Sequence, residues 1–154
     1  MAQDGTFLYF SFGSYMSSAR IHQFCPTASF VSIGQVYGKR IRFCGWSESW
    51  KGAGSTMVEG GEVVWGVVWR LERGQLPMLD RQESPLLARG EIEVELGSGE
   101  KLQCQAYHMC KEENDELPSP MYLKTIVAGA REHGLPEDYV RNTFLCVQNN
   151  GYKE

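Results

Sequence analysis

The sequence lacks the features that mark several common classes of protein. No apolar run approaches the roughly 20 residues of a membrane-spanning helix, and the first fifteen residues carry Asp4 but no basic stretch, which argues against a secretion signal. The formal net charge is −4, with no basic cluster longer than two residues, which disfavours nucleic-acid binding. We therefore expect a soluble, cytoplasmic protein that binds neither nucleic acid nor membrane.

Metal-binding and disulfide patterns are also missing. The five cysteines include no C-x-x-C pair, whereas a zinc site usually brings its ligands in closely spaced pairs. The three histidines are dispersed and form no Cys-His or Ser-His-Asp spacing. We expect reduced thiols that pack as small core residues, and no metal site. The cysteines are Cys25, Cys44, Cys104, Cys110 and Cys146.

What is present indicates one globular unit. The 154 residues are 42% hydrophobic and 12% aromatic, which is enough to bury a core and predicts a single domain over residues 1–154. Apolar and alternating segments predict strands at residues 7–12, 28–36, 39–43, 62–70, 91–96 and 101–109. Capping residues and helical spacing predict helices at residues 17–24, 76–82, 120–133 and 136–145. This order indicates an α+β domain.

Two connections are predicted from glycine. A turn at Tyr37-Gly38 would separate the strands at 28–36 and 39–43, and residues 45–61 are too rich in glycine for a regular element. We expect 45–61 to form a long loop, of the kind that often carries function, with one strand pairing inside it as the alternative. Within it, Lys51-Gly52-Ala53-Gly54-Ser55-Thr56 lacks the spacing of a phosphate-binding loop, so nucleotide binding is not expected.

Two places could carry chemistry. In Leu79–Pro85, the carboxylates of Asp80 and Glu83 lie where a predicted helix gives way to a loop, a junction from which a side chain can point into a cleft. In Gly13-Ser14-Tyr15-Met16 a strand ends and a helix begins, so backbone N–H groups can converge on an anion. Each place also has a purely structural interpretation, a helix end and a tight turn respectively.

Several blocks of this sequence resemble the gamma-glutamylcyclotransferase family, in the family's order and over nearly the whole chain. The first resembles the tyrosine-glycine-serine-asparagine loop of that family. The blocks are Phe7–Met16, Glu62–Trp69, Leu79–Glu83, Pro118–Tyr122 and Gly129–Pro136.

The resemblance implies an α+β fold around a mixed, barrel-like sheet with flanking helices and a pocket at one end. It implies a lyase reaction in which the α-amine of a gamma-glutamyl amino acid attacks its own γ-carbonyl, giving 5-oxoproline and a free amino acid. No cofactor is implied. The resemblance also suggests a homodimer and a place in glutathione metabolism.

By motif match, Glu83 falls where the family keeps its catalytic glutamate. This carboxylate would take a proton from the amine and return it to the leaving group. An ordinary Glu pKa of about 4.3 is low for that task, so we expect burial to raise the pKa of Glu83. The substrate-binding residues that the resemblance implies are Phe12, Gly13, Ser14, Tyr15, Met16 and Tyr122.

The sequence departs from the family at Phe12, where a tyrosine is usual, and at Tyr15, where an asparagine is usual. Residues 84–90 also lack a tyrosine that is common after the family's glutamate. Two alternatives therefore stay open at this point. One is a relative that acts on gamma-glutamylamines, and the other is a non-catalytic paralogue that binds a small carboxylate or a partner protein.

Overall fold

The computed structural model describes residues 5–83, 86–109 and 112–153. Cys110 and the Ser84-Pro85 step lie outside the described residues. The strands are β1 (Thr6–Ser11), β2 (Ser29–Ser47), β3 (Gly52–Glu72), β4 (Leu87–Leu96) and β5 (Lys101–Met109). The helices are α1 (Ser18–His22), α2 (Leu76–Glu83), α3 (Pro120–Glu132) and α4 (Glu137–Val140). Short 3-10 turns cover Ser14–Met16 and Arg73–Gln75, and a π-helical turn covers Arg141–Leu145.

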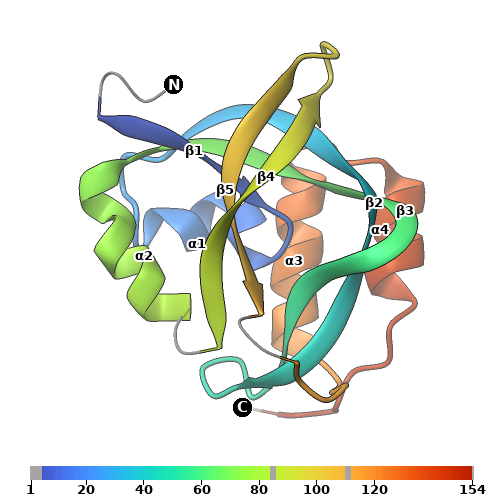
Figure 1. The fold of residues 1–154 in the computed structure, drawn as a ribbon. Coiled ribbons are helices and arrows are strands. Elements are labelled where there is room, and N and C mark those ends of the chain that lie inside the picture. Colours follow the sequence, from blue (N-terminus) through green and yellow to red (C-terminus); the bar gives the residue numbers. More distant parts are fainter. Residues whose placement is uncertain (1–4, 84–85, 110–111, 154) are drawn as a thin grey trace.

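The strands form a closed barrel in the order β1-β3-β2-β4-β5 (Figure 1). Neighbouring strands run antiparallel, except that β1 and β5 meet in parallel at Tyr9 and Gln105 and so close the barrel. Closure removes the exposed sheet edges that would otherwise invite pairing with another chain. The mixed barrel with flanking helices confirms the predicted α+β class.

Strand β2 corrects the predicted turn at Tyr37-Gly38. The chain does not reverse there: β2 continues from Ser29 to Ser47 and pairs with β3 on both sides of Gly38. Gly38 has a φ of +81°, and the register of the pairing shifts between Tyr37 and Lys39. The turn signal therefore marks a bulge, which bends the strand without ending it.

Strand β3 corrects the predicted loop over residues 45–61. Only the tip between Ser47 and Gly52 connects strands, and β3 runs without interruption from Gly52 to Glu72. Gly52 allows close packing rather than flexibility: a Cβ at this position would lie 2.6 Å from the backbone nitrogen of Ser119. A high glycine content is found both in flexible loops and in strands that a second segment approaches closely, so composition alone could not distinguish the two.

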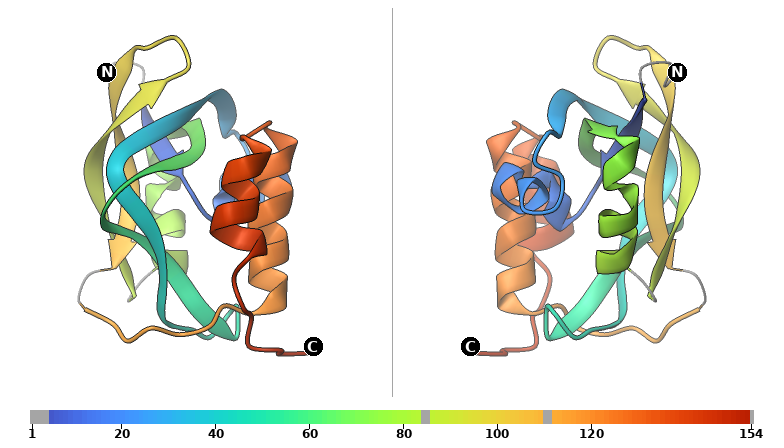
Figure 2. Two further views of the ribbon diagram at one scale, coloured as in Figure 1. Left: turned by 90° about the vertical axis from the view of Figure 1, so that its right-hand side faces the viewer. Right: turned by 90° about the vertical axis from the view of Figure 1, so that its left-hand side faces the viewer.

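Two hydrophobic clusters meet along β1. Phe10 and Phe12 point into the barrel, where they join buried residues from the other four strands. Phe7 and Tyr9, on the opposite face of β1, join the cluster between the barrel and the helices. Figure 2 shows α3 and α4 side by side on one side of the barrel, covering this second cluster. The alternation of β1 therefore divides its aromatic residues between two cores.

The predicted helix limits are close to the observed ones. Ser119 caps α3 by accepting a hydrogen bond from the Tyr122 backbone N–H, and the chain leaves α3 through Gly134, whose φ is +77°. The predicted helix at 136–145 is divided between α4 and the π-helical turn. None of the helices in the described residues is long and apolar enough to cross a membrane.

The cysteine prediction is confirmed for three of the thiols. Cys25, Cys44 and Cys104 are buried and unbridged, and burial raises the pKa values of Cys25 and Cys104 to about 11. Cys146 is a free thiol on the surface, so the prediction of a core position is wrong for this residue. It directly follows the π-helical turn, and its Sγ donates a hydrogen bond of 3.1 Å to the backbone oxygen of Asn142.

Candidate active site

The loop after β1 is held in place by its neighbours. Its 3-10 turn, Ser14–Met16, is followed by Ser17, whose side chain caps α1. The indole Nε1 of Trp69 donates a hydrogen bond of 2.9 Å to the backbone oxygen of Tyr15, which ties the loop to β3. The backbone N–H groups of Ser14 and Tyr15 donate to no other described residue. They are therefore available to an anion.

Helix α3 packs directly against this loop. A Cβ on Gly129 would lie 2.4 Å from the backbone nitrogen of Ser17 and 2.6 Å from the backbone carbon of Met16. Only glycine permits such an approach without displacing backbone. The position of the loop therefore depends on a residue that is far from it in the sequence.

Glu83 is the last residue of α2 and lines the cavity beside this loop. The helix is anchored by Leu79, which is fully buried on its inner face. Glu83 keeps some exposed surface as a residue, but protein surrounds its carboxyl group. Neither a hydrogen bond nor an ion pair joins this carboxyl to another described residue.

Burial raises the pKa of Glu83 to about 7, and the positive charge of Arg20 offsets part of that rise. Desolvation is the dominant cause, because the charged form loses water that no protein donor replaces. This matches the raised pKa expected from the sequence. A carboxyl group with this pKa can both accept and return a proton near neutral pH.

Four tyrosines surround the carboxyl group of Glu83. Burial raises the pKa of each phenol, and the negative charge of Glu83 raises it further. All four therefore stay protonated at neutral pH and can serve as hydrogen-bond donors. They are Tyr9, Tyr15, Tyr107 and Tyr122.

Tyr122 projects from the first turn of α3 into the same cavity. Its Oη lies 2.8 Å from Oγ of Ser55, a buried residue of β3. The two hydroxyls hold each other in place, so the phenol of Tyr122 is fixed beside Glu83 by a residue of the barrel.

The site consists of two adjoining cavities. The inner one has a volume of about 30 Å³, room for one or two water-sized groups, and the outer one about 290 Å³. Ser14, Glu83, Leu87 and Tyr122 border both. The inner cavity is lined by Tyr9, Ser11, Phe12, Gly13, Ser14, Tyr15, Ser55, Glu83, Leu87, Tyr107 and Tyr122.

The inner cavity brings together most of the residues selected from the sequence. Glu83 and five of the six predicted substrate-binding residues line it. Met16 does not: its side chain is fully buried in the core and borders neither cavity. Tyr15 is also buried, and its Oη has no hydrogen-bond partner in the described part of the chain.

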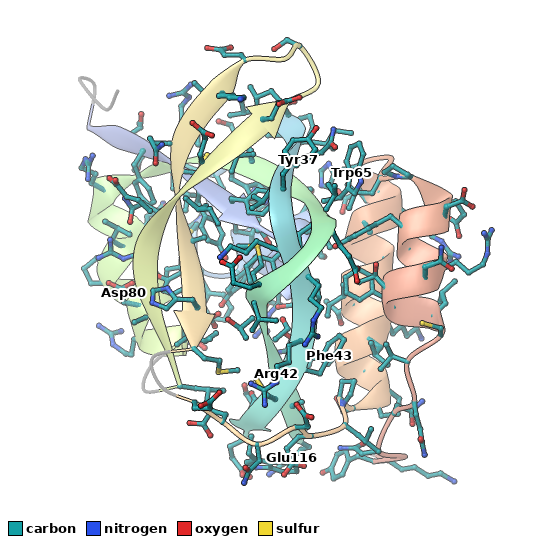
Figure 3. All side chains as sticks on the ribbon, turned by 45° about the vertical axis from the view of Figure 1, so that its right-hand side comes forward. Tyr37, Arg42, Phe43, Trp65, Asp80 and Glu116 are labelled. Carbon is teal, nitrogen blue, oxygen red and sulfur yellow. The ribbon has the colours of Figure 1, made fainter. Side chains whose placement is uncertain are left out.

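Asp80, the other carboxylate at the end of α2, lies outside both cavities. Its two oxygens accept hydrogen bonds of 2.7 and 3.0 Å from Nε and Nη2 of Arg89, and Tyr107 Oη donates another of 2.5 Å. These bonds lower the pKa of Asp80, with Arg89 as the main cause. In Figure 3 Asp80 lies on the side of the barrel away from α3 and α4. Asp80 therefore holds α2 against the hairpin of β4 and β5.

Sequence reasoning missed Tyr9, Tyr107 and Ser55 as site residues. Alternation along β1 could have placed Tyr9 and Ser11 on one face, beside Gly13. No local signal pointed to Ser55, because its segment was interpreted as a loop. Tyr107 lines the inner cavity because closure of the barrel pairs its strand, β5, with β1.

No group of three or more metal-ligating side chains occurs in the described residues. The histidines near the loop have structural roles. His133 stacks on Phe30 with ring centroids 4.8 Å apart, and Nε2 of His22 lies 2.9 Å from the backbone oxygen of Ala28.

The amino-acid sequence is similar to that of a known protein family and of several of its members. A sequence model of the AIG2-like family matches residues 63–142. The gamma-glutamylcyclotransferase of Bos taurus is 37% identical over 161 residues, which cover 99% of this chain and 85% of that protein. The gamma-glutamylcyclotransferase of Homo sapiens is 34% identical, covering 96% of this chain and 81% of that protein.

The fold agrees with these similarities. A solved structure described as a gamma-glutamyl cyclotransferase matches with a TM-score of 0.91 at 32% identity, covering 97% of this chain and 92% of that one. The protein is thus an AIG2-like α+β barrel. More specifically, the chain belongs to the gamma-glutamylcyclotransferase family.

Proposed function

We propose that this protein is a gamma-glutamylcyclotransferase that converts a gamma-glutamyl amino acid into 5-oxoproline and a free amino acid. Family membership supports the reaction class. The observation that carries the mechanism is the carboxyl group of Glu83, buried beside a cavity, unpaired among the described residues, with a pKa of about 7.

The substrate supplies both reacting groups. Its α-amine forms the new C–N bond to its own γ-carbonyl carbon, and the amide C–N bond to the second amino acid then breaks. Holding a flexible chain in this ring-closing geometry can lower the barrier by several kcal/mol without a covalent enzyme intermediate. The junction of the two cavities, next to Glu83, is where the glutamyl part would bind.

Proton transfer is the remaining task. Two protons leave the attacking nitrogen and two reach the leaving nitrogen, so the reaction consumes no net acid or base. In this proposal Glu83 accepts protons from the amine as a carboxylate and passes them to the leaving nitrogen as a carboxylic acid. A pKa near 7 suits both directions.

The remaining site residues bind and orient in this proposal. The free backbone N–H groups of Ser14 and Tyr15 bind the α-carboxylate or the oxyanion that develops on the γ-oxygen. Tyr122, fixed by Ser55, orients the substrate or Glu83. Gly13 and Phe12 shape the wall of the inner cavity.

The test is the formation of 5-oxoproline from gamma-glutamyl-alanine by the parent protein, by Glu83→Gln and by the control Glu93→Gln, which removes an exposed carboxylate on β4. We expect product from the parent and the control, and a loss of at least about 100-fold in Glu83→Gln. Equal rates for parent and Glu83→Gln would refute the role of Glu83. Absence of product from the parent would refute the proposed activity on this substrate.

Further expectations, drawn from the composition of the sequence or from the resemblance, stay predictions. They are a single domain over residues 1–154, a cytoplasmic location, a homodimer, a place in glutathione metabolism, and no binding of nucleic acid or membrane. The closed barrel and the nearly full-length similarity support the single domain. Sedimentation of the purified protein tests the dimer.

A further inference from the structure

We propose that Arg20 binds the carboxylate of the leaving amino acid and so makes the enzyme select gamma-glutamyl amino acids over gamma-glutamylamines. This inference rests on the proposed function. Arg20 lies on α1 and lines the outer cavity, which it shares with Glu83.

The guanidinium of Arg20 is held in place by aromatic rings. Its Cζ lies 4.8 Å from the ring centroid of Trp50, 5.1 Å from that of Phe24 and 5.7 Å from that of Tyr15. Such contacts orient a guanidinium but do not neutralise its charge. The side chain is thus ordered in advance, which reduces the entropy lost when a ligand binds.

Arg20 forms no ion pair with a described residue, and the carboxyl group that its charge influences is that of Glu83, across the same cavity. Its side chain donates one hydrogen bond, from Nη1 to Oε1 of Gln23 at 3.3 Å, and Nε is buried without a partner. Four of the other eight arginines form ion pairs with Asp or Glu among the described residues: Arg42, Arg89, Arg131 and Arg141. A planar guanidinium with free donors matches a carboxylate, which can accept two parallel N–H bonds.

The arrangement of the two cavities puts the guanidinium of Arg20 where the leaving amino acid would lie. Glu83 borders both cavities, and the inner one has room for only one or two water-sized groups. The leaving nitrogen therefore faces the outer cavity of about 290 Å³. In an amino acid the carboxylate is two bonds from that nitrogen, so it enters the same cavity as Arg20.

The charges of the outer cavity agree with this assignment. Arg20 is the one cationic side chain among the described residues that line it. The carboxylate of Glu48, which also lines it, is paired with Lys51 and with Trp46 Nε1. Glu48 therefore does not compete for the guanidinium. A substrate carboxylate would find Arg20 unpaired.

The experiment compares gamma-glutamyl-alanine with gamma-glutamyl-ethylamide, which has the same leaving amine without the carboxylate. We expect the parent protein to prefer the first substrate. Arg20→Met keeps an apolar side chain over the rings but removes the charge. It should raise KM for gamma-glutamyl-alanine by about 10- to 100-fold, as loss of a hydrogen bond to a charged group does, and change KM for the ethylamide by less than about 3-fold.

The matched control is Arg73→Met. The guanidinium of Arg73 also lies over a ring, 5.7 Å from the centroid of Phe7, but borders neither cavity of the site. We expect its KM values to match those of the parent. Arg20→Lys keeps the charge without the planar group and should be intermediate. Circular dichroism melts establish that each variant is folded.

Two results would overturn the inference. One is an equal loss on both substrates in Arg20→Met, which would mean that Arg20 acts through Glu83 alone. The other is equal affinity of Glu83→Gln protein for the two compounds in calorimetric titration, a readout that needs no turnover. A different result separates the two proposals. If the parent protein forms no 5-oxoproline but binds gamma-glutamyl-alanine more tightly than gamma-glutamyl-ethylamide, the proposed function is refuted and the assignment of Arg20 as the carboxylate-binding residue stands.

Discussion

The hydroxyl groups of Ser55 and Tyr122 lie 2.8 Å apart and join the barrel to the first turn of α3 at the wall of the inner cavity. Tyr122→Phe leaves the Ser55 hydroxyl buried without its partner. We expect the free energy of unfolding to fall by about 1–2 kcal/mol. Urea denaturation measures this, and Ser55→Ala provides the second arm of a double-mutant cycle. Strictly additive losses in the double variant would show that the two groups are uncoupled.

Gly129 sets the distance between α3 and the loop after β1. In Gly129→Ala the new methyl group would meet the Ser17 nitrogen at 2.4 Å, so the loop has to shift. We expect a loss of about 1–3 kcal/mol in unfolding free energy and a lower kcat/KM. Gly74→Ala is the control, because nothing lies within 4 Å of its Cβ position. A Gly129→Ala variant as stable and active as the control would contradict this close packing.

Tyr15 buries a hydroxyl that finds no partner in the described part of the chain. Tyr15→Phe removes that hydroxyl with little change of shape, so we expect unfolding free energy to stay constant or rise by up to about 1 kcal/mol. Tyr107→Phe is the comparison, because Tyr107 donates to Asp80 at 2.5 Å. This second change should cost about 1.5–3 kcal/mol. A clear loss of stability in Tyr15→Phe, approaching that of Tyr107→Phe, would show instead that the Tyr15 hydroxyl is satisfied in the folded protein.

The raised pKa of Glu83 has a consequence for stability. The folded protein holds this proton with a pKa of about 7, above the ordinary value of 4.5, so the group favours folding below about pH 4.5. That contribution to the free energy of unfolding is lost as pH rises through 7. The loss reaches roughly 3 kcal/mol when Glu83 is fully ionised. Glu83→Gln should therefore gain stability relative to the parent between pH 5 and pH 9, measured by urea denaturation. The control Glu93→Gln, which changes an exposed carboxylate, should have the same pH dependence of unfolding free energy as the parent between pH 5 and pH 9.

Much of this fold could be predicted from the sequence. Alternation over residues 91–96 predicted the hairpin of β4 and β5, and the cap at Ser119 with Gly134 matches the limits of α3. The long strands β2 and β3 could not be predicted, because a bulge at Gly38 and close packing at Gly52 use the same residue as turns and loops do.

The candidate site could be predicted where it is local in sequence and not where it depends on tertiary contacts. The loop after β1 and Glu83 were selected from their motifs, and the raised pKa of Glu83 was expected from the proton transfer that the resemblance implies for this residue. Ser55 and Tyr107 reach the cavity only through barrel closure and strand pairing. The unpaired state of Arg20 likewise depends on which carboxylates the fold keeps away from it.

The most direct test of the account is the pH dependence of kcat/KM for 5-oxoproline formation from gamma-glutamyl-alanine. The carboxylate form of Glu83 has to be present to accept the first proton, so the rate should rise with pH to a midpoint near 7. At pH 5 it should lie about 100-fold below the plateau. A profile that has already levelled off at pH 5, as an ordinary exposed glutamate would give, would contradict the role assigned to Glu83.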